Sequence, residues 1–171
     1  MYKLRYGGAL IGKEEKKAIM KVVDKNYWPL AKKKKKMEEE AAKFLGVKHA
    51  ILANSGSSAG LLALASLDLP KGAEVIIPAT TFPTIFNIIV QCGLRPVVVD
   101  SKVGSYNLDP EEIEQAITEN TKAIICVHAV GNPVDMPAVM KVAKKHKLYV
   151  IEDNCDGWGG TIGNKKVGSF G

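Results

Sequence analysis

The 171-residue sequence predicts an α/β fold, in which a mostly parallel sheet is covered by helices on both faces. From Lys48 onward, short apolar runs alternate with segments of helical periodicity, which is typical of parallel strands joined by crossover helices. The strand candidates are uninterrupted apolar runs, as expected for a sheet that is buried on both faces. Polar and aromatic residues collect where these strands end, and ligands bind at that edge in sheets of this class.

Two helices are predicted in an N-terminal helical segment, residues 1–46. The first covers roughly Lys13 to Asn26. Pro29 then interrupts the helical pattern, because proline disfavours helix at the residue before it. The second helix ends at Gly46, which we interpret as its C-cap.

Residues 47–171 are predicted to form the sheet and its helices. The predicted strands are His49–Ala53, Glu74–Pro78, Pro96–Asp100, Ala123–His128 and Tyr149–Asp153. The helices between them are predicted near Ala59–Leu67, Pro83–Cys92, Pro110–Ile117 and Asp135–His146. Asp109 followed by Pro110 is a typical helix start, with Asp109 as the N-cap. Lys165 and Lys166 are predicted to lie in an exposed hairpin.

The composition favours a globular protein, with 46% hydrophobic and 25% charged residues. No apolar run reaches the roughly 18 residues that suggest a membrane span. The N-terminus also lacks the apolar stretch of a signal peptide. We therefore expect a cytoplasmic protein with no membrane partner.

The net charge of +6 does not predict a nucleic-acid partner. The basic residues are nearly all lysine, with Arg5 and Arg95 as the two arginines, whereas arginine is the usual residue for bidentate phosphate and base recognition. The lysine run 32–36 is followed by Glu38–Glu40, as on a solvated, salt-bridged helix face. The three cysteines form no C-x-x-C pair, so neither a disulfide framework nor a metal site is predicted.

A small, hydroxyl-rich turn precedes the helix predicted near Ala59–Leu67. Gly56, Ser57 and Ser58 would direct free backbone N–H groups and two hydroxyls at one point, where the helix N-terminus adds a partial positive charge. This arrangement indicates an anion site, most often for phosphate. The alternative is that Ser57 or Ser58 is simply the N-cap of the helix.

Asp153 ends the last predicted strand, where it could be an N-cap, a metal ligand or a general base. A further use is to pair with a protonated pyridine nitrogen, as pyridoxal phosphate requires. That cofactor also needs a phosphate cradle and a flat side chain over its ring, and Phe82 supplies such a side chain at the same edge. His128 could be a ring neighbour or general acid, or a partly buried histidine at a strand end.

Several stretches, in their order and spacing, resemble the N-terminal half of the DegT/StrS-type, pyridoxal-phosphate-dependent sugar aminotransferases. That family has the aspartate-aminotransferase fold, the fold-type I architecture of these enzymes. The resemblance extends from about Gly8 to Gly171. The matching stretches include Asn54-Ser55-Gly56-Ser57-Ser58-Ala59, Thr81-Phe82, Pro96-Val97-Val98-Val99-Asp100, Gly131-Asn132-Pro133-Val134-Asp135-Met136 and Ile151-Glu152-Asp153.

The resemblance implies roles for individual residues. Gly56, Ser57 and Ser58 are expected to hold the cofactor phosphate, Phe82 to stack on the pyridine ring, and Asp153 to bind the ring nitrogen. Asp156 stands near the ring's 3-hydroxyl, where the family usually has glutamine or histidine. This departure, within Glu152-Asp153-Asn154-Cys155-Asp156, resembles the branch of 3-dehydrases that act on CDP- or GDP-linked 4-keto-6-deoxy sugars. The same branch is indicated by Phe82-Pro83-Thr84, Gly131-Asn132-Pro133 and the Ser57-Ser58 pair.

That branch implies pyridoxamine phosphate as cofactor, a sugar-nucleotide substrate and a histidine base in place of the family's cofactor-bound lysine. The alternative is an aminotransferase of the same family, with glutamate as amino donor. Some dehydrases carry an iron–sulfur cluster, to which Cys92, Cys126 and Cys155 are not assigned. The family also implies a homodimer.

The catalytic lysine or histidine is expected beyond Gly171, as are the rest of the large domain and the small C-terminal domain. We therefore expect residues 47–171 to be a partial cofactor-binding domain that is inactive by itself. An alternative of another class is a non-catalytic α/β fragment that serves as a dimerisation or scaffold piece.

Overall fold

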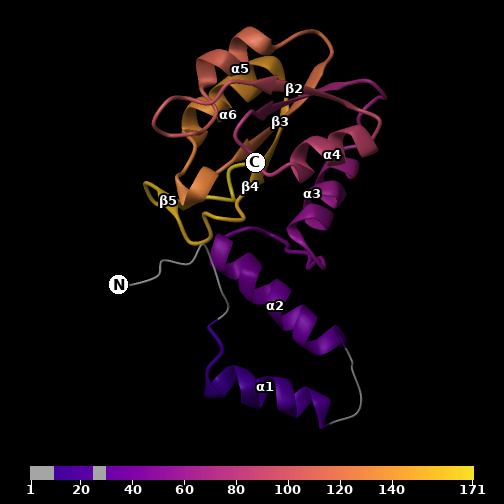
Figure 1. The fold of residues 1–171 in the computed structure, drawn as a ribbon, viewed down its shortest axis with the longest axis vertical. Coiled ribbons are helices and arrows are strands. Elements are labelled where there is room, and N and C mark those ends of the chain that lie inside the picture. The colour runs from indigo at the N-terminus through magenta and orange to yellow at the C-terminus, as the bar shows by residue number, and fades with distance from the viewer. Residues whose placement is uncertain (1–9, 25–29) are drawn as a thin grey trace. The chain divides into compact units, whose positions relative to one another are not determined.

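The computed structural model describes residues 10–24 and 30–171 (Figure 1). Contacts divide the chain into two units at Met37 and Glu38, within the second helix. The elements are, in order, α1 (Lys13–Val23), α2 (Leu30–Leu45), α3 (Gly56–Ala65), β1 (Glu74–Pro78), α4 (Thr84–Gln91), β2 (Arg95–Val99), α5 (Pro110–Ala116), β3 (Thr121–Val127), a 3₁₀ turn (Ala129–Gly131), α6 (Met136–His146), β4 (Tyr149–Asp153), β5 (Thr161–Ile162) and β6 (Lys165–Lys166).

The four long strands form one parallel sheet in the order β2-β1-β3-β4. The chain passes from β1 outward to β2 and then returns to the other side of β1 to form β3. The strand order therefore reverses between β1 and β3. In open α/β sheets such a switch point marks the edge where ligands bind, at the carboxyl ends of the strands.

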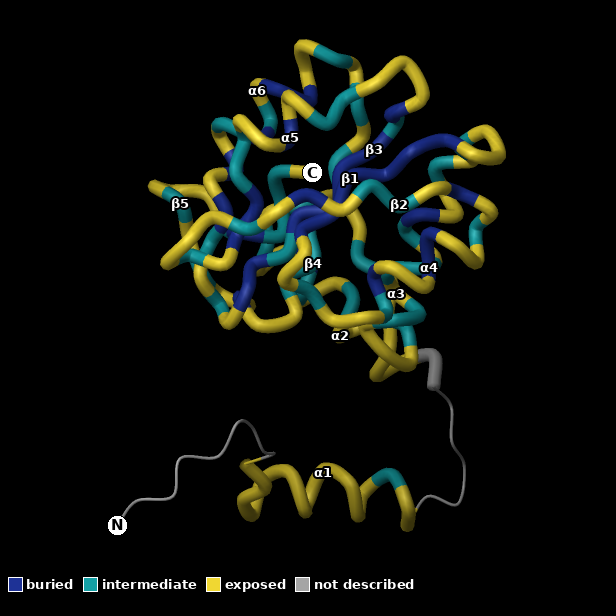
Figure 2. Tube along the Cα trace, turned by 45° about the horizontal axis from the view of Figure 1, so that its top comes forward, coloured by how far each residue is buried: buried dark blue, intermediate teal, exposed yellow. Residues whose placement is uncertain are grey.

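Alternate residues along the strands pack on opposite faces of the sheet, as side chains in a strand must. Ile76 and Ile124 lie in the core beneath α5 and α6. Val75 and Ile125 lie in the core beneath α3 and α4. Figure 2 shows the central strands as the most continuously buried part of the chain. Helices thus cover both faces, which confirms the predicted fold class.

Most predicted elements are confirmed to within three residues. β1 and β4 have the predicted bounds, while β2 and β3 begin one and two residues earlier than predicted. Asp109 caps α5 as predicted, because its side chain accepts a hydrogen bond from the Glu111 amide. Gly46 follows α2 with a φ of 72°, and the next amide closes the helix on Ala42. The predicted break around Pro29 lies outside the described residues.

The predicted hairpin is also confirmed. Thr161 pairs with Lys166, and Ile162 pairs with Lys165, in an antiparallel ladder. Gly163 allows the tight connection because its φ is 58°, a left-handed conformation that glycine adopts without steric cost.

The predicted strand His49–Ala53 is wrong. This segment forms no strand ladder, and the Leu52 amide instead donates to a carboxylate oxygen of Glu38 at 2.8 Å. Ile51 is 79% exposed and Leu52 49% exposed. An apolar run forms a strand only where a neighbouring strand hydrogen-bonds to its backbone N–H and C=O groups. None of the described strands pairs with this segment.

Glu74 links three strands at the amino ends of the sheet. It lies opposite Arg95 of β2 and Thr121 of β3 in the register, and its carboxylate forms an ion pair with Arg95. The hydroxyls of Thr118 and Thr121 donate to the same carboxylate at 2.6 and 3.1 Å. The hydrogen bonds from Thr118 and Thr121 and the charge of Arg95 hold the pKa of Glu74 below its ordinary value, although burial opposes this shift.

We predict that Glu74→Gln lowers the free energy of unfolding at pH 7 by about 1–3 kcal/mol, since the hydroxyls lose a charged acceptor. Because the folded-state pKa of Glu74 is depressed, this stabilisation is present above pH 4.5 and is lost as the pH falls through the folded value. Urea unfolding of both proteins at pH 7 and at pH 3 measures the difference. A difference that is equal at the two pH values would contradict this role for the carboxylate.

Candidate functional site

The N-terminus of α3 leaves two backbone amides available. The N-cap is Ser55, whose hydroxyl oxygen accepts from the Ser58 amide at 3.1 Å, so neither Ser57 nor Ser58 is the cap. Among the described residues, no acceptor faces the amides of Gly56 or Ser57. Free amides and the positive end of a helix dipole are the features that favour an anion at a helix N-terminus, as the sequence predicted here.

Gly56 places this helix start against the end of β4. A Cβ atom at position 56 would lie 3.0 Å from the Cys155 sulfur, so only glycine allows this approach without a shift. The Cys155 amide in turn donates to a carboxylate oxygen of Asp153 at 3.1 Å. The predicted phosphate cradle and the predicted ring-nitrogen partner therefore meet, although they lie far apart in the sequence.

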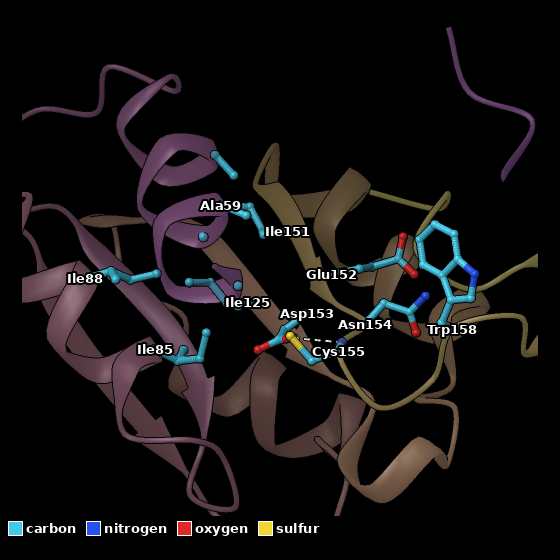
Figure 3. Close-up of a pocket in the computed structure, with 13 residues that line it drawn as sticks. Ala59, Ile85, Ile88, Ile125, Ile151, Glu152, Asp153, Asn154, Cys155 and Trp158 are labelled. Carbon is cyan, nitrogen blue, oxygen red and sulfur yellow. Dashed lines mark hydrogen bonds between the residues drawn. The ribbon is translucent and has the colours of Figure 1, made fainter. Parts of the chain in front are cut away.

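Gly56 and Asp153 line one cavity of about 470 Å³ (Figure 3). Its walls are mainly apolar, and small residues form the α3 side. In Figure 3 the Asp153 side chain lies beside that of Cys155 at the end of β4. The other lining residues are Ala59, Gly60, Ala63, Ile85, Ile88, Ile125, Ile151, Glu152, Asn154 and Trp158.

The other predicted site residues do not line this cavity. Ser57 and Ser58 follow Gly56 in the first turn of α3. Phe82 precedes α4 and is 70% exposed, so its ring is largely open to solvent. Asp156 is exposed, and its backbone oxygen lies 3.0 Å from where a Cβ of Gly131 would stand. The roles of all six predicted site residues, Gly56 and Asp153 included, stay predictions.

His128 is a buried structural residue in this geometry. Its Nδ1 atom accepts from the Val134 amide at 3.1 Å, so the ring proton must be on Nε2. Nε2 lies 3.2 Å from a Glu152 carboxylate oxygen and donates to it. Its backbone amide donates to the Asp153 carbonyl at 3.1 Å. Of the two alternatives for His128, the structure supports the buried histidine at a strand end.

Glu152 lies at the same strand end as Asp153, where the sequence places it, but no role was predicted for it. Its carboxylate accepts from His128 and from the amides of Gly168, Phe170 and Gly171. Burial alone would raise the pKa of Glu152, but the hydrogen bonds from His128 and the three amides outweigh it and lower the pKa. Strand alternation predicts only that Glu152 projects to the opposite face from Asp153, and not which groups it contacts there.

Cys126 and Cys155 do not supply a thiolate here. The hydrogen bond to Asp153, burial and the negative charges of Asp153 and Asp156 raise the pKa of Cys155 to about 11. Burial and the charge of Glu152 raise the pKa of Cys126. Both thiols are therefore protonated at neutral pH. Among residues 10–24 and 30–171, no cluster of three acidic, histidine or cysteine side chains could hold a metal ion.

No helix in the described part of the chain combines the length and the apolar character needed to cross a bilayer.

Solved structures of the same architecture identify the class of this protein. An Escherichia coli GDP-4-keto-6-deoxy-D-mannose-3-dehydratase with bound hydrated pyridoxal phosphate superimposes with a TM-score of 0.91 at 34% identity. The superposition covers 98% of this chain and 45% of that one. The fold is that of the pyridoxal-phosphate-dependent transferases of fold type I.

The chain belongs to the DegT/DnrJ/EryC1/StrS aminotransferase family, whose model matches residues 9–171. It is 40% identical over 176 residues to the dTDP-4-dehydro-2,6-dideoxy-D-glucose 3-dehydratase of Saccharopolyspora spinosa, over 98% of this chain and 38% of the relative. It is 42% identical over 134 residues to the GDP-perosamine synthase of Caulobacter vibrioides, over 78% of this chain and 36% of the relative. The chain thus spans less than half the length of these relatives.

We predict that Ser55→Ala lowers the stability of the protein by about 1 kcal/mol, because α3 loses its N-cap. Ser57→Ala is the matched control, since no described residue bonds to the Ser57 hydroxyl. Thermal unfolding monitored by circular dichroism compares the two variants. A loss of stability in Ser57→Ala alone would instead assign the cap to Ser57.

Proposed function

We propose that this chain is part of a sugar-nucleotide 3-dehydratase that uses pyridoxamine or pyridoxal phosphate. The observation that carries the proposal is that Gly56, at the start of α3, and Asp153, at the end of β4, line one cavity and meet through Cys155. The residues fit the cofactor, because the amides of Gly56 and Ser57 suit a phosphate and lack another acceptor among the described residues.

The side chains of this chain then have distinct tasks. The amides of Gly56 and Ser57, with the Ser58 hydroxyl, would bind the phosphate. The Asp153 carboxylate would hold a proton on the ring nitrogen, and Phe82 would cover one face of the ring. When bound, the protonated ring supplies an electron sink that allows bonds at the neighbouring substrate carbon to break.

Asp156 supports the dehydratase over other members of the family. It would lie near the ring's 3-hydroxyl, where the related aminotransferases usually carry glutamine or histidine. The 3-dehydratases among the matched relatives add support. The substrate would be a sugar nucleotide, the base a histidine and the assembly a homodimer.

A nucleotide-sugar aminotransferase is the second candidate. The similarity to a GDP-perosamine synthase favours it. In that case a lysine would be the base and glutamate the amino donor. In both cases we expect this stretch alone to bind cofactor without turnover, because neither a lysine nor a histidine lines the cavity in the described part of the chain.

We predict that the protein binds pyridoxamine 5′-phosphate saturably and that Asp153→Asn weakens this binding by about tenfold or more. That factor corresponds to the loss of one hydrogen bond between charged groups. Asparagine can still accept from the Cys155 amide, so the local turn is kept. Fluorescence titration or calorimetry measures the dissociation constant.

Asp100→Asn is the matched control for this titration. Like Asp153, Asp100 stands at the carboxyl end of a strand of the same sheet and accepts from a nearby amide, that of Ser101 at 2.8 Å. It follows β2, at the other end of the strand order from β4. Equal weakening in both variants, or a folded protein that does not bind the ligand, would favour the scaffold alternative.

A further inference from the structure

Glu152 and Asp153 are neighbours on β4 that project to opposite sides of the sheet. Val150, two residues before Glu152, packs in the core beneath α5 and α6, whereas Ile151 packs beneath α3 and α4. Asp153 follows the Ile151 side and reaches Cys155 next to α3. Figure 3 shows the two carboxylates pointing apart, that of Glu152 toward Trp158. The two acids therefore have different surroundings and different tasks.

The Glu152 carboxylate is saturated with hydrogen-bond donors. One oxygen accepts from the amides of Phe170 and Gly171, the latter at 2.8 Å. The other oxygen accepts from the Gly168 amide at 2.8 Å and from His128 at 3.2 Å. A carboxylate has about four acceptor positions, and all of them are used here.

This carboxylate is a buried anion held by N–H groups. The Glu152 side chain is 3% exposed, and the basic side chain beside it, His128, is neutral because its Nδ1 accepts a backbone hydrogen bond. A glutamine at this position would present one acceptor oxygen and an amino group to four N–H donors. Position 152 therefore requires a charge, and the shape of the side chain is insufficient.

His128 connects this anion to Asp153. Its ring donates to the Glu152 carboxylate, while its backbone amide donates to the Asp153 carbonyl. The turn Gly168–Gly171 is attached through the same carboxylate. The Glu152 carboxylate thus joins three segments that are distant in sequence: the end of β3, the end of β4 and this turn.

We propose that Glu152 is a positioning residue of the cofactor site, which holds the end of β4 so that the Asp153 carboxylate faces the ring nitrogen. This inference rests on the proposed function. Glu152 lines the cavity, but its carboxylate points away from that of Asp153, so it acts through the backbone of β4 and the turn Gly168–Gly171.

The test compares Glu152→Gln with Glu74→Gln in the same protein. Glu74 is the matched control, because it is an equally buried, hydrogen-bonded carboxylate at the amino end of the same sheet, away from the cavity. Affinity for pyridoxamine 5′-phosphate is measured at a temperature where both variants are folded. Amide hydrogen exchange of Gly168–Gly171 reports directly on the attachment of the turn.

We expect Glu152→Gln to weaken binding about tenfold, as for the loss of one hydrogen bond to a charged group, and to accelerate exchange in the turn. Glu74→Gln should lose stability but retain the wild-type dissociation constant. If Glu152→Gln and Glu74→Gln bind pyridoxamine 5′-phosphate with equal affinity while Asp153→Asn still binds it more weakly, the role of Glu152 is overturned. The proposed function is then unaffected. A folded wild-type protein that binds no ligand would overturn the proposed function and this role together.

Discussion

The burial of the parallel sheet on both faces is the constraint on which the rest of the structure depends. Because helices cover each face, neither face of the central strands can carry polar groups without strong compensation. Polar chemistry is therefore confined to the strand ends. Glu74 occupies the amino edge, and Glu152 with Asp153 occupies the carboxyl edge, beside the start of α3.

The buried carboxylates at the two edges are stabilised by different kinds of partner. Glu74 pairs with an arginine and two hydroxyls, and it joins strands that are already adjacent in the sheet. Glu152 is satisfied by backbone amides and a neutral imidazole, which bring separate segments together around the strand that ends in Asp153. The contacts of Glu74 stabilise the fold, and we infer that those of Glu152 position Asp153 in the site.

Much of the fold could be predicted from the sequence because its signals are local. The run Glu74–Pro78 and the helix start at Asp109 each carry their own apolar pattern or cap. His49–Ala53 carries a similar apolar pattern but lacks a pairing strand, which no local signal reveals. The contacts of Glu152 come from residues remote in sequence, so its environment could not be predicted. The position of Asp153 could be predicted, since the end of a strand already specifies its edge of the sheet.

A crystal structure of the protein grown with pyridoxamine 5′-phosphate tests the central claim most directly. The account predicts the phosphate at the amides of Gly56 and Ser57, and the ring nitrogen within about 3 Å of the Asp153 carboxylate. It also predicts that Glu152 keeps its contacts with the turn Gly168–Gly171. Ligand bound at another place, or a ring nitrogen that faces a group other than Asp153, would contradict it.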